Sequence, residues 1–147
     1  MNAEEFLSQY LDAKSRLHRL NEERESIRDL MTHITPRYDS VSVRHDRNVN
    51  KIPDALGKLE ELDKKYSEES RRAVELMEQI HDVIYMVPDG KQREILTMRY
   101  ILGYQIKRIA LEMKITDRTV CRLQRCAMEQ AQSVLNELPT GRRFTSE

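Results

Sequence analysis

The sequence predicts an all-α protein in which a long, coiled-coil-like N-terminal helical hairpin precedes a helix-turn-helix domain. The composition supports this fold class. Charged residues make up 34% of the 147 residues, Gly and Pro number four each, and the mean hydropathy is −0.72. Such a composition favours long solvated helices. The second observation is a seven-residue apolar repeat in residues 3–34 and again in 54–87, and the third is a series of short amphipathic segments after it.

Residues 3–34 carry the repeat of a long amphipathic helix. Side chains spaced by seven and by four residues share one face of a helix, as in a coiled-coil seam. The two rows on this face are Phe6, Ala13, Leu20, Ile27 and Ile34, and Tyr10, Leu17, Arg24 and Met31. Arg24 is the one polar member. Thr35-Pro36 ends the predicted helix, because the residue before a proline disfavours helical backbone.

Residues 54–86 carry a second repeat of the same kind, with Pro53 at its start. Its rows are Leu59, Tyr66, Ala73, Ile80 and Val87, and Leu56, Asp63, Ser70, Met77 and Ile84. Each long helix has an apolar stripe that it cannot bury alone, so we expect the two helices to pack antiparallel. Residues 35–53 between them are predicted to be an irregular loop, with a short strand at 40–43 as the alternative. The basic part of this loop, 37–51, is expected to be a plain connection, with a DNA-contacting arm as the alternative.

Further apolar residues flank these seams and predict self-association of residues 1–87. They are Leu7, Leu11, Leu30, Leu62, Leu76 and Val83. A two-helix hairpin buries only one side of each helix, and proteins rarely leave such a patch exposed. We therefore expect a homo-oligomer, a dimer or larger.

Residues 88–138 are predicted to form a domain of three short helices, at 90–102, 105–113 and 117–135. Asp89 and Thr116 have the residue types that cap helix N-termini. The small side chain of Ala110 lets the last two helices cross closely, as in a helix-turn-helix. We expect residues 88–138 to fold without the hairpin and residues 139–147 to be a flexible tail.

The last helix of this domain has aliphatic residues on one side and arginines on the other, which predicts a DNA-binding face. Residues 88–147 contain eleven basic and seven acidic side chains, a net charge of +4 on a chain that is neutral overall. A helix with outward arginines fits the major groove, where arginine contacts guanine or phosphate. The candidate DNA-binding residues are Lys107, Arg108, Lys114, Thr116, Arg118, Thr119, Arg122 and Arg125. The alternative interpretation of these arginines is an ordinary solvated helix face.

The segment 88–135 resembles the region-four helix-turn-helix of bacterial sigma factors. The residues that carry the resemblance are Arg93, Glu94, Arg99, Tyr100, Gly103, Ile109, Ala110, Ile115, Thr116 and Val120. Together with the two long helices before it, the segment is similar to phage-encoded regulators of the RinA and ArpU type. The sequence departs from the family at three positions. Tyr104 stands where a Ser or Thr cap is usual, Lys114 replaces the turn glycine, and Asp117 replaces a common arginine.

The resemblance implies a sequence-specific double-stranded DNA-binding transcription regulator of phage or prophage genes, with RNA polymerase as a further candidate partner. Two alternatives are a small-terminase-like DNA-packaging subunit and a helical adaptor that does not bind DNA. No catalytic motif is present, so we expect no enzyme activity and no cofactor. The histidines lack metal-ligand spacing, which predicts no metal site. Cys121 and Cys126 are expected to be reduced thiols, and the absence of a long apolar run predicts a cytoplasmic protein without a membrane span.

Overall fold

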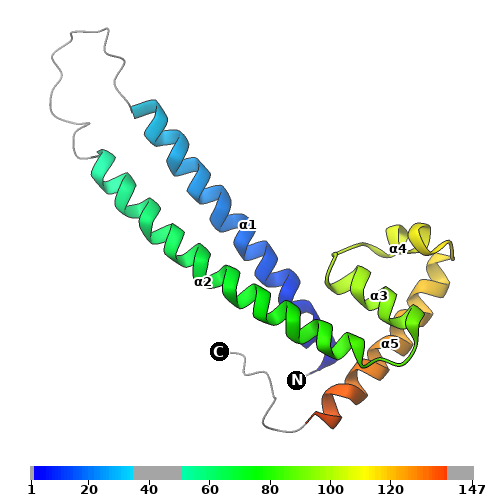
Figure 1. Ribbon diagram of the computed structural model, residues 1–147. Helices are drawn as coiled ribbons and strands as arrows, with labels where there is room; N and C mark the ends of the chain where they lie inside the picture. Colours follow the sequence, from blue (N-terminus) through cyan, green and yellow to red (C-terminus); the bar gives the residue numbers. More distant parts are fainter. Residues whose placement is uncertain (1, 35–50, 139–147) are drawn as a thin grey trace, which may run out of the picture. The chain divides into compact units, whose positions relative to one another are not determined.

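The computed structural model describes residues 2–34 and 51–138, with side chains described for 2–33 and 53–138. This part of the chain is all-α, as predicted (Figure 1). Its helices are α1 (Ala3–Ile34), α2 (Lys51–Tyr85), α3 (Gly90–Tyr100), α4 (Ile106–Met113) and α5 (Asp117–Glu137). The strand expected at 40–43, most of the basic loop and the tail at 139–147 lie outside the described residues. No helix in the described ranges has the length and hydropathy to cross a membrane.

The chain divides into two compact units, which differ from the domains expected from the sequence. The hairpin unit contains Lys14–Arg72, and the head unit contains Met1–Ala13 and Ala73–Glu147. The head unit therefore includes the first turns of α1 and the last turns of α2, in addition to α3, α4 and α5. The expected boundary at residue 87 assigned those turns to the hairpin.

In the hairpin unit, α1 and α2 run alongside each other in opposite directions (Figure 1). Two polar residues of the predicted seams meet, with Arg24 Nε 2.6 Å from Asp63 Oδ1. The guanidinium of Arg24 also lies 4.3 Å from the centre of the Tyr66 ring. Arg16 Nε and Glu69 Oε2 form a longer ion pair, at 3.6 Å. The hairpin is thus joined by polar as well as apolar contacts.

The main core of the head unit draws on α1, α2, α3 and α5. Its buried residues are Ala3, Phe6, Leu7, Ile80, Val83, Ile84, Val87, Leu96, Tyr100, Ile101, Ala127 and Ala131. A hydrogen bond from the Ala3 amide to Gln132 Oε1, at 2.8 Å, also connects α1 to α5. Burial raises the pKa of the Tyr100 phenol, while a hydrogen bond with Gln124 acts in the opposite direction. Residues 3–7 and 80–87 are therefore part of the core on which α3 and α5 pack.

Part of the flanking apolar rows, which predicted an oligomer, is buried within the single chain. Leu7, Leu62 and Val83 are 0%, 2% and 1% exposed within the single chain. Leu7 and Val83 are covered because they belong to the head-unit core with residues of α3 and α5. Leu11 and Leu76 are half-buried, and Leu30, at 58% exposure, is the one member of the set that stays largely in solvent. Three of the six residues are thus buried within the single chain, and self-association of residues 1–87 stays a prediction.

A second, smaller cluster holds α3, α4 and α5 together. Ile95, Ile109, Ala110 and Val120 are its buried members. Ala110 is 5% exposed, as expected for a small side chain where α4 packs on α5. Asp89 caps α3 as predicted, since its side-chain oxygen Oδ1 accepts hydrogen bonds from the amides of Lys91 and Gln92 at 2.8 and 3.2 Å. The helices of the predicted helix-turn-helix therefore pack through the apolar residues that recur at helical spacing in the sequence.

Candidate nucleic-acid interface

The first helix of the helix-turn-helix, α4, starts one residue later than the predicted helix at 105–113. Gln105, and not Tyr104, is the N-cap of α4, and its side chain makes no capping hydrogen bond. The prediction that Tyr104 occupies the cap position was wrong. Burial of Ile109 and Ala110 against α5 stabilises α4 in place of a side-chain cap.

The turn between α4 and α5 depends on Lys114, whose backbone is left-handed with φ 57° and ψ 43°. It is the one non-glycine residue with positive φ in the described ranges. Two hydrogen bonds close the turn, from the Lys114 amide to the Leu111 carbonyl at 3.4 Å and from the Ile115 amide to the Ala110 carbonyl at 3.1 Å. Glycine favours this conformation, and the chain has a lysine in its place.

Replacing Lys114 with Gly should change stability and DNA affinity in opposite directions. Left-handed backbone costs a residue with a Cβ about 1–2 kcal/mol, and the unfolded-state freedom of glycine offsets about 0.5–1 kcal/mol of the gain. Thermal unfolding should therefore show a stabilisation of up to about 1.5 kcal/mol. The lost charge should lower the salt slope of DNA binding by about one. Lys114→Asn is the control, because Asn tolerates this backbone without restoring the charge. Unchanged DNA binding by Lys114→Gly would show that Lys114 contacts no phosphate.

The second helix of the motif begins with a well-formed cap. Thr116 Oγ1 accepts a hydrogen bond from the Thr119 amide at 3.2 Å and lies 2.8 Å from Thr119 Oγ1. This confirms Thr116 as the cap of α5. The hydroxyl of Thr119 is already engaged with Thr116, so a contact from Thr119 to a base would involve its methyl group or a rearranged hydroxyl.

The two sides of α5 differ in exposure as predicted. Val120, Ala127 and Ala131 are fully buried on one side. Arg118, Arg122 and Arg125 are exposed on the other, and the reduced thiols of Cys121 and Cys126 are also exposed. The burial of the aliphatic residues fixes the direction in which the arginines project.

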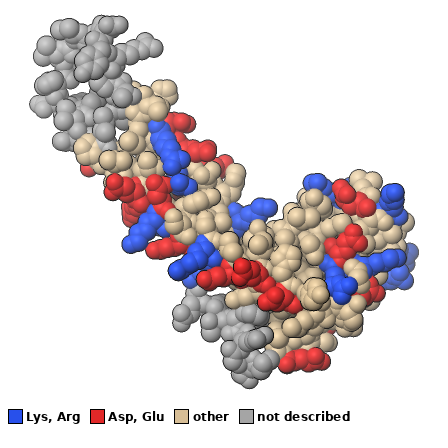
Figure 2. Space-filling view, in the orientation of Figure 1, with Lys and Arg blue, Asp and Glu red and all other residues tan. Residues whose placement is uncertain are grey.

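Lys107 and Arg108 add exposed positive charge from α4. In the described part of the chain, none of the basic candidates on α4, the turn and α5 forms an ion pair with a carboxylate. Figure 2 shows lysine and arginine side chains over the surface of the helix-turn-helix, with a few acidic side chains among them. The basic candidate residues therefore keep their donors available for a ligand.

Two arginines of the sigma-like motif have structural roles. Arg93 Nη1 donates to the Val87 carbonyl at 3.0 Å, which holds the turn between α2 and α3. Arg99 Nη1 donates to the Tyr104 carbonyl at 3.1 Å, which holds the loop before α4. Both side chains are partly buried. These contacts explain the two arginines without a role in DNA binding.

Tyr104 is the residue of this surface that sequence reasoning missed. Its ring lies 3.8 Å from the guanidinium carbon of Arg108. A signal for this contact was present in the sequence, because an aromatic residue and an arginine four positions apart are suitably spaced for a cation–π pair. From the sequence, Tyr104 was interpreted only as a departure from the usual Ser or Thr cap.

No group of three or more metal-ligating side chains occurs in the described ranges.

Comparison with known proteins agrees with the helix-turn-helix geometry. The chain as a whole matches no curated protein and no solved structure. Residues 89–123 match the family model for Sigma-70, region 4, which covers α3, α4 and the start of α5 and every candidate residue except Arg125. This segment is therefore similar to a sigma-70 region 4 helix-turn-helix, and the match supports DNA binding in a transcription-related role.

Proposed function

We propose that this protein is a sequence-specific double-stranded DNA-binding transcription regulator. The observation that carries the proposal is the exposed face of α5, where Arg118, Arg122 and Arg125 project from a helix whose other side is buried. The major groove is about 12 Å wide and admits one such helix. The family match at residues 89–123 supports the same function independently.

The candidate residues divide into two roles by position. Arg122 lies one turn inside α5, where a recognition helix reaches base edges, and we assign it to base contact. Arg118, Thr119 and Arg125 neighbour it on the same helix. The residues assigned to phosphate contact are Lys107, Arg108, Lys114 and Thr116, because they lie on α4, in the turn and at the N-terminus of α5. Phosphate contacts position the protein, and base contacts determine its sequence preference.

The regulation of phage or prophage genes rests on resemblance, and RNA polymerase is proposed as a further partner on the same basis. Co-sedimentation with core polymerase tests whether RNA polymerase is a partner.

Selection of bound fragments from random duplex DNA, followed by footprinting, tests the DNA-binding function itself. A defined site with salt-sensitive affinity supports the regulator. Light scattering that shows a ring-sized assembly would favour the packaging subunit, and absence of salt-sensitive binding would favour the adaptor.

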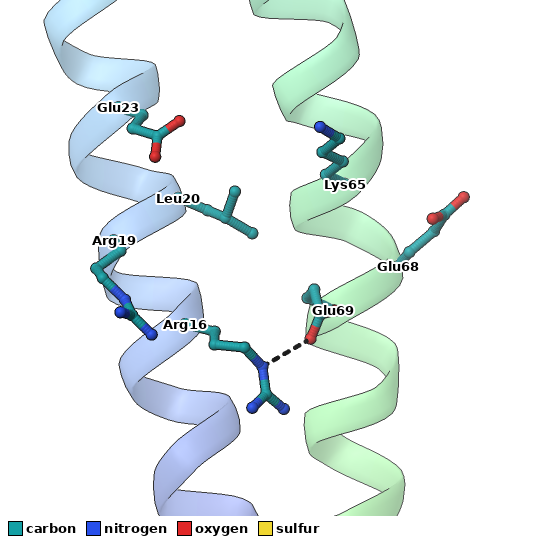
Figure 3. Close-up of a pocket in the computed structure, with 7 residues that line it drawn as sticks. All are labelled: Arg16, Arg19, Leu20, Glu23, Lys65, Glu68 and Glu69. Atoms are coloured by element: carbon teal, nitrogen blue, oxygen red, sulfur yellow. Dashed lines mark ion pairs between the residues drawn. The ribbon is translucent and has the colours of Figure 1, made fainter. Parts of the chain in front are cut away.

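A charged surface of the hairpin unit supports self-association. This surface is distinct from the flanking apolar residues that predicted an oligomer from the sequence. A hollow of about 550 Å³ lies between α1 and α2 (Figure 3). Leu20 lies in it, and the charged residues at its rim are Arg16, Arg19, Glu23, Lys65, Glu68 and Glu69. Figure 3 shows Arg16 of α1 facing Glu69 of α2 and Glu23 of α1 across from Lys65 of α2, while Arg19 and Glu68 lie on the outer flanks of their helices.

This charge pattern is complementary to itself. Rotation by half a turn about an axis parallel to the helices would place α1 of a second copy over α2 of the first. Arginines then face glutamates at one end, and Glu23 faces Lys65 at the other. An isologous dimer needs a surface of this kind. The three positive and three negative side chains cancel, which favours a second copy over a polyanion as the occupant.

Charge reversal at this surface should change the oligomeric state. Arg19→Glu and Glu68→Arg should each weaken a dimer at least tenfold, because each places like charges together, which costs several kcal/mol in an interface. Combining both reversals in one chain should restore it. Sedimentation measures the state, and Arg71→Glu, an exposed reversal outside the hollow, is the control. A wild-type monomer at micromolar concentration would refute the dimer and leave the DNA-binding proposal intact.

A further inference from the structure

The guanidinium of Arg108 is held on an aromatic ring at the edge of the proposed DNA-binding surface. Its carbon lies 3.8 Å from the centre of the Tyr104 ring. Arg108 is exposed, and in the described part of the chain it has no carboxylate partner. A solvent-exposed arginine ordinarily samples many rotamers, so a contact that restrains one arginine among several calls for an explanation.

The ring that carries Arg108 is itself restrained by the fold. The Tyr104 amide donates to the Met98 carbonyl at 2.9 Å, and the Tyr104 carbonyl accepts from Arg99 Nη1 at 3.1 Å. The side chain of Tyr104 packs against the cluster of Ile95, Ile109, Ala110 and Val120. Tyr104 is therefore fixed by its backbone and its side chain, and it offers a rigid platform at the start of α4.

Stacking leaves the donors of the guanidinium free. A cation–π contact uses the flat face of the group, while the N–H donors point outward in its plane. Phosphate binds arginine through this edge, commonly by two parallel hydrogen bonds. One guanidinium can therefore stack on Tyr104 and bind a phosphate at the same time. The ring reduces the rotamer freedom that Arg108 loses on binding.

We infer that Tyr104 is a positioning residue that holds Arg108 as a preorganised phosphate clamp on the DNA backbone. The inference rests on the proposed DNA-binding function and adds to it a residue that does not touch the nucleic acid. Ordering one long side chain in advance is expected to strengthen binding by about two- to tenfold.

The experiment compares Tyr104→Phe, Tyr104→Leu, Arg108→Ala and the double variant Tyr104→Leu/Arg108→Ala on a duplex selected by the wild-type protein. Tyr104→Phe keeps the ring and should bind like wild type. Tyr104→Leu should bind about two- to tenfold more weakly. Arg108→Ala should bind more weakly and lower the salt slope by about one. The double variant should be no weaker than Arg108→Ala, because Tyr104 acts only through Arg108.

A purely structural role for Tyr104 predicts a different result. Tyr104→Leu would then weaken binding by the same factor with Arg108 present or replaced, and that outcome would overturn the inference. The NMR shift of the Arg108 side-chain N–H in the free protein gives a second measurement. The ring current should displace it in wild type and Tyr104→Phe but not in Tyr104→Leu. If the wild type binds no duplex DNA, the proposed function fails, and the NMR result still reports whether the stack exists.

Discussion

Replacement of Phe6 with Ala should lower the free energy of unfolding of the head unit by about 3–5 kcal/mol. Phe6 is 1% exposed and belongs to the core that α1, α2, α3 and α5 share. Truncation of such a side chain loses its transfer free energy and leaves a cavity between elements far apart in sequence. Urea denaturation measures the loss. Hydrogen exchange at the Ala127 and Ala131 amides of α5 should accelerate with it.

Leu30→Ala is the matched control for Phe6→Ala. Leu30 lies on the same helix but is 58% exposed, so its truncation should change stability by less than about 0.5 kcal/mol. Equal effects of the two variants would contradict the packing of α1 in the head unit. The same core implies that a fragment of residues 88–138 loses Phe6, Leu7, Ile80 and Val83 as neighbours. We therefore expect that fragment to be poorly folded, in contrast to the expectation from the sequence.

Replacement of Arg122 with Ala should reduce affinity for the selected DNA site by about 5- to 150-fold, which corresponds to about 1–3 kcal/mol. The reason is the position of Arg122 on the exposed face of α5, where an arginine donates two hydrogen bonds to guanine. Binding to random duplex DNA should change little, because that binding depends on phosphate contacts. Titration of both duplexes at several salt concentrations measures the difference.

Lys107→Ala is the comparison for Arg122→Ala. Lys107 is exposed on α4 and assigned to phosphate, so its loss should weaken both duplexes equally and lower the salt slope by about one. The contrast between the two variants separates base contact from phosphate contact. If Arg122→Ala loses the same affinity on selected and random DNA, Arg122 does not read a base.

Much of the fold follows from local signals in the sequence. The seven-residue repeat identifies the inward faces of α1 and α2, and the residue types of Asp89 and Thr116 mark the starts of α3 and α5. These signals are reliable because they report which side chains avoid water and which backbone amides need a partner. The exposed arginines of α5 follow from the same reasoning, since the aliphatic side must be buried.

Other features depend on contacts between distant residues. Periodicity shows that Leu7 and Val83 need cover, but it does not show that α3 and α5 provide it. The cap of α4 was misplaced because Gln105 is a weak capping residue and the burial of Ile109 and Ala110 stabilises the helix without one. The contact between Tyr104 and Arg108 depends on where α4 begins, and the burial of Ile109 and Ala110 determines that position.

The ion pair between Arg24 and Asp63 has a consequence for the alignment of the two long helices. Within the hairpin unit, an apolar pattern that repeats every seven residues is nearly unchanged when one helix slides past the other by seven residues. Only one alignment brings together these two residues, which are 39 apart in sequence. In any other, Arg24 loses its carboxylate partner at a site where its side chain is 16% exposed. Each loss of about 1.4 kcal/mol reduces the population of a misaligned hairpin tenfold. A misaligned hairpin should therefore be less populated at equilibrium than the native one.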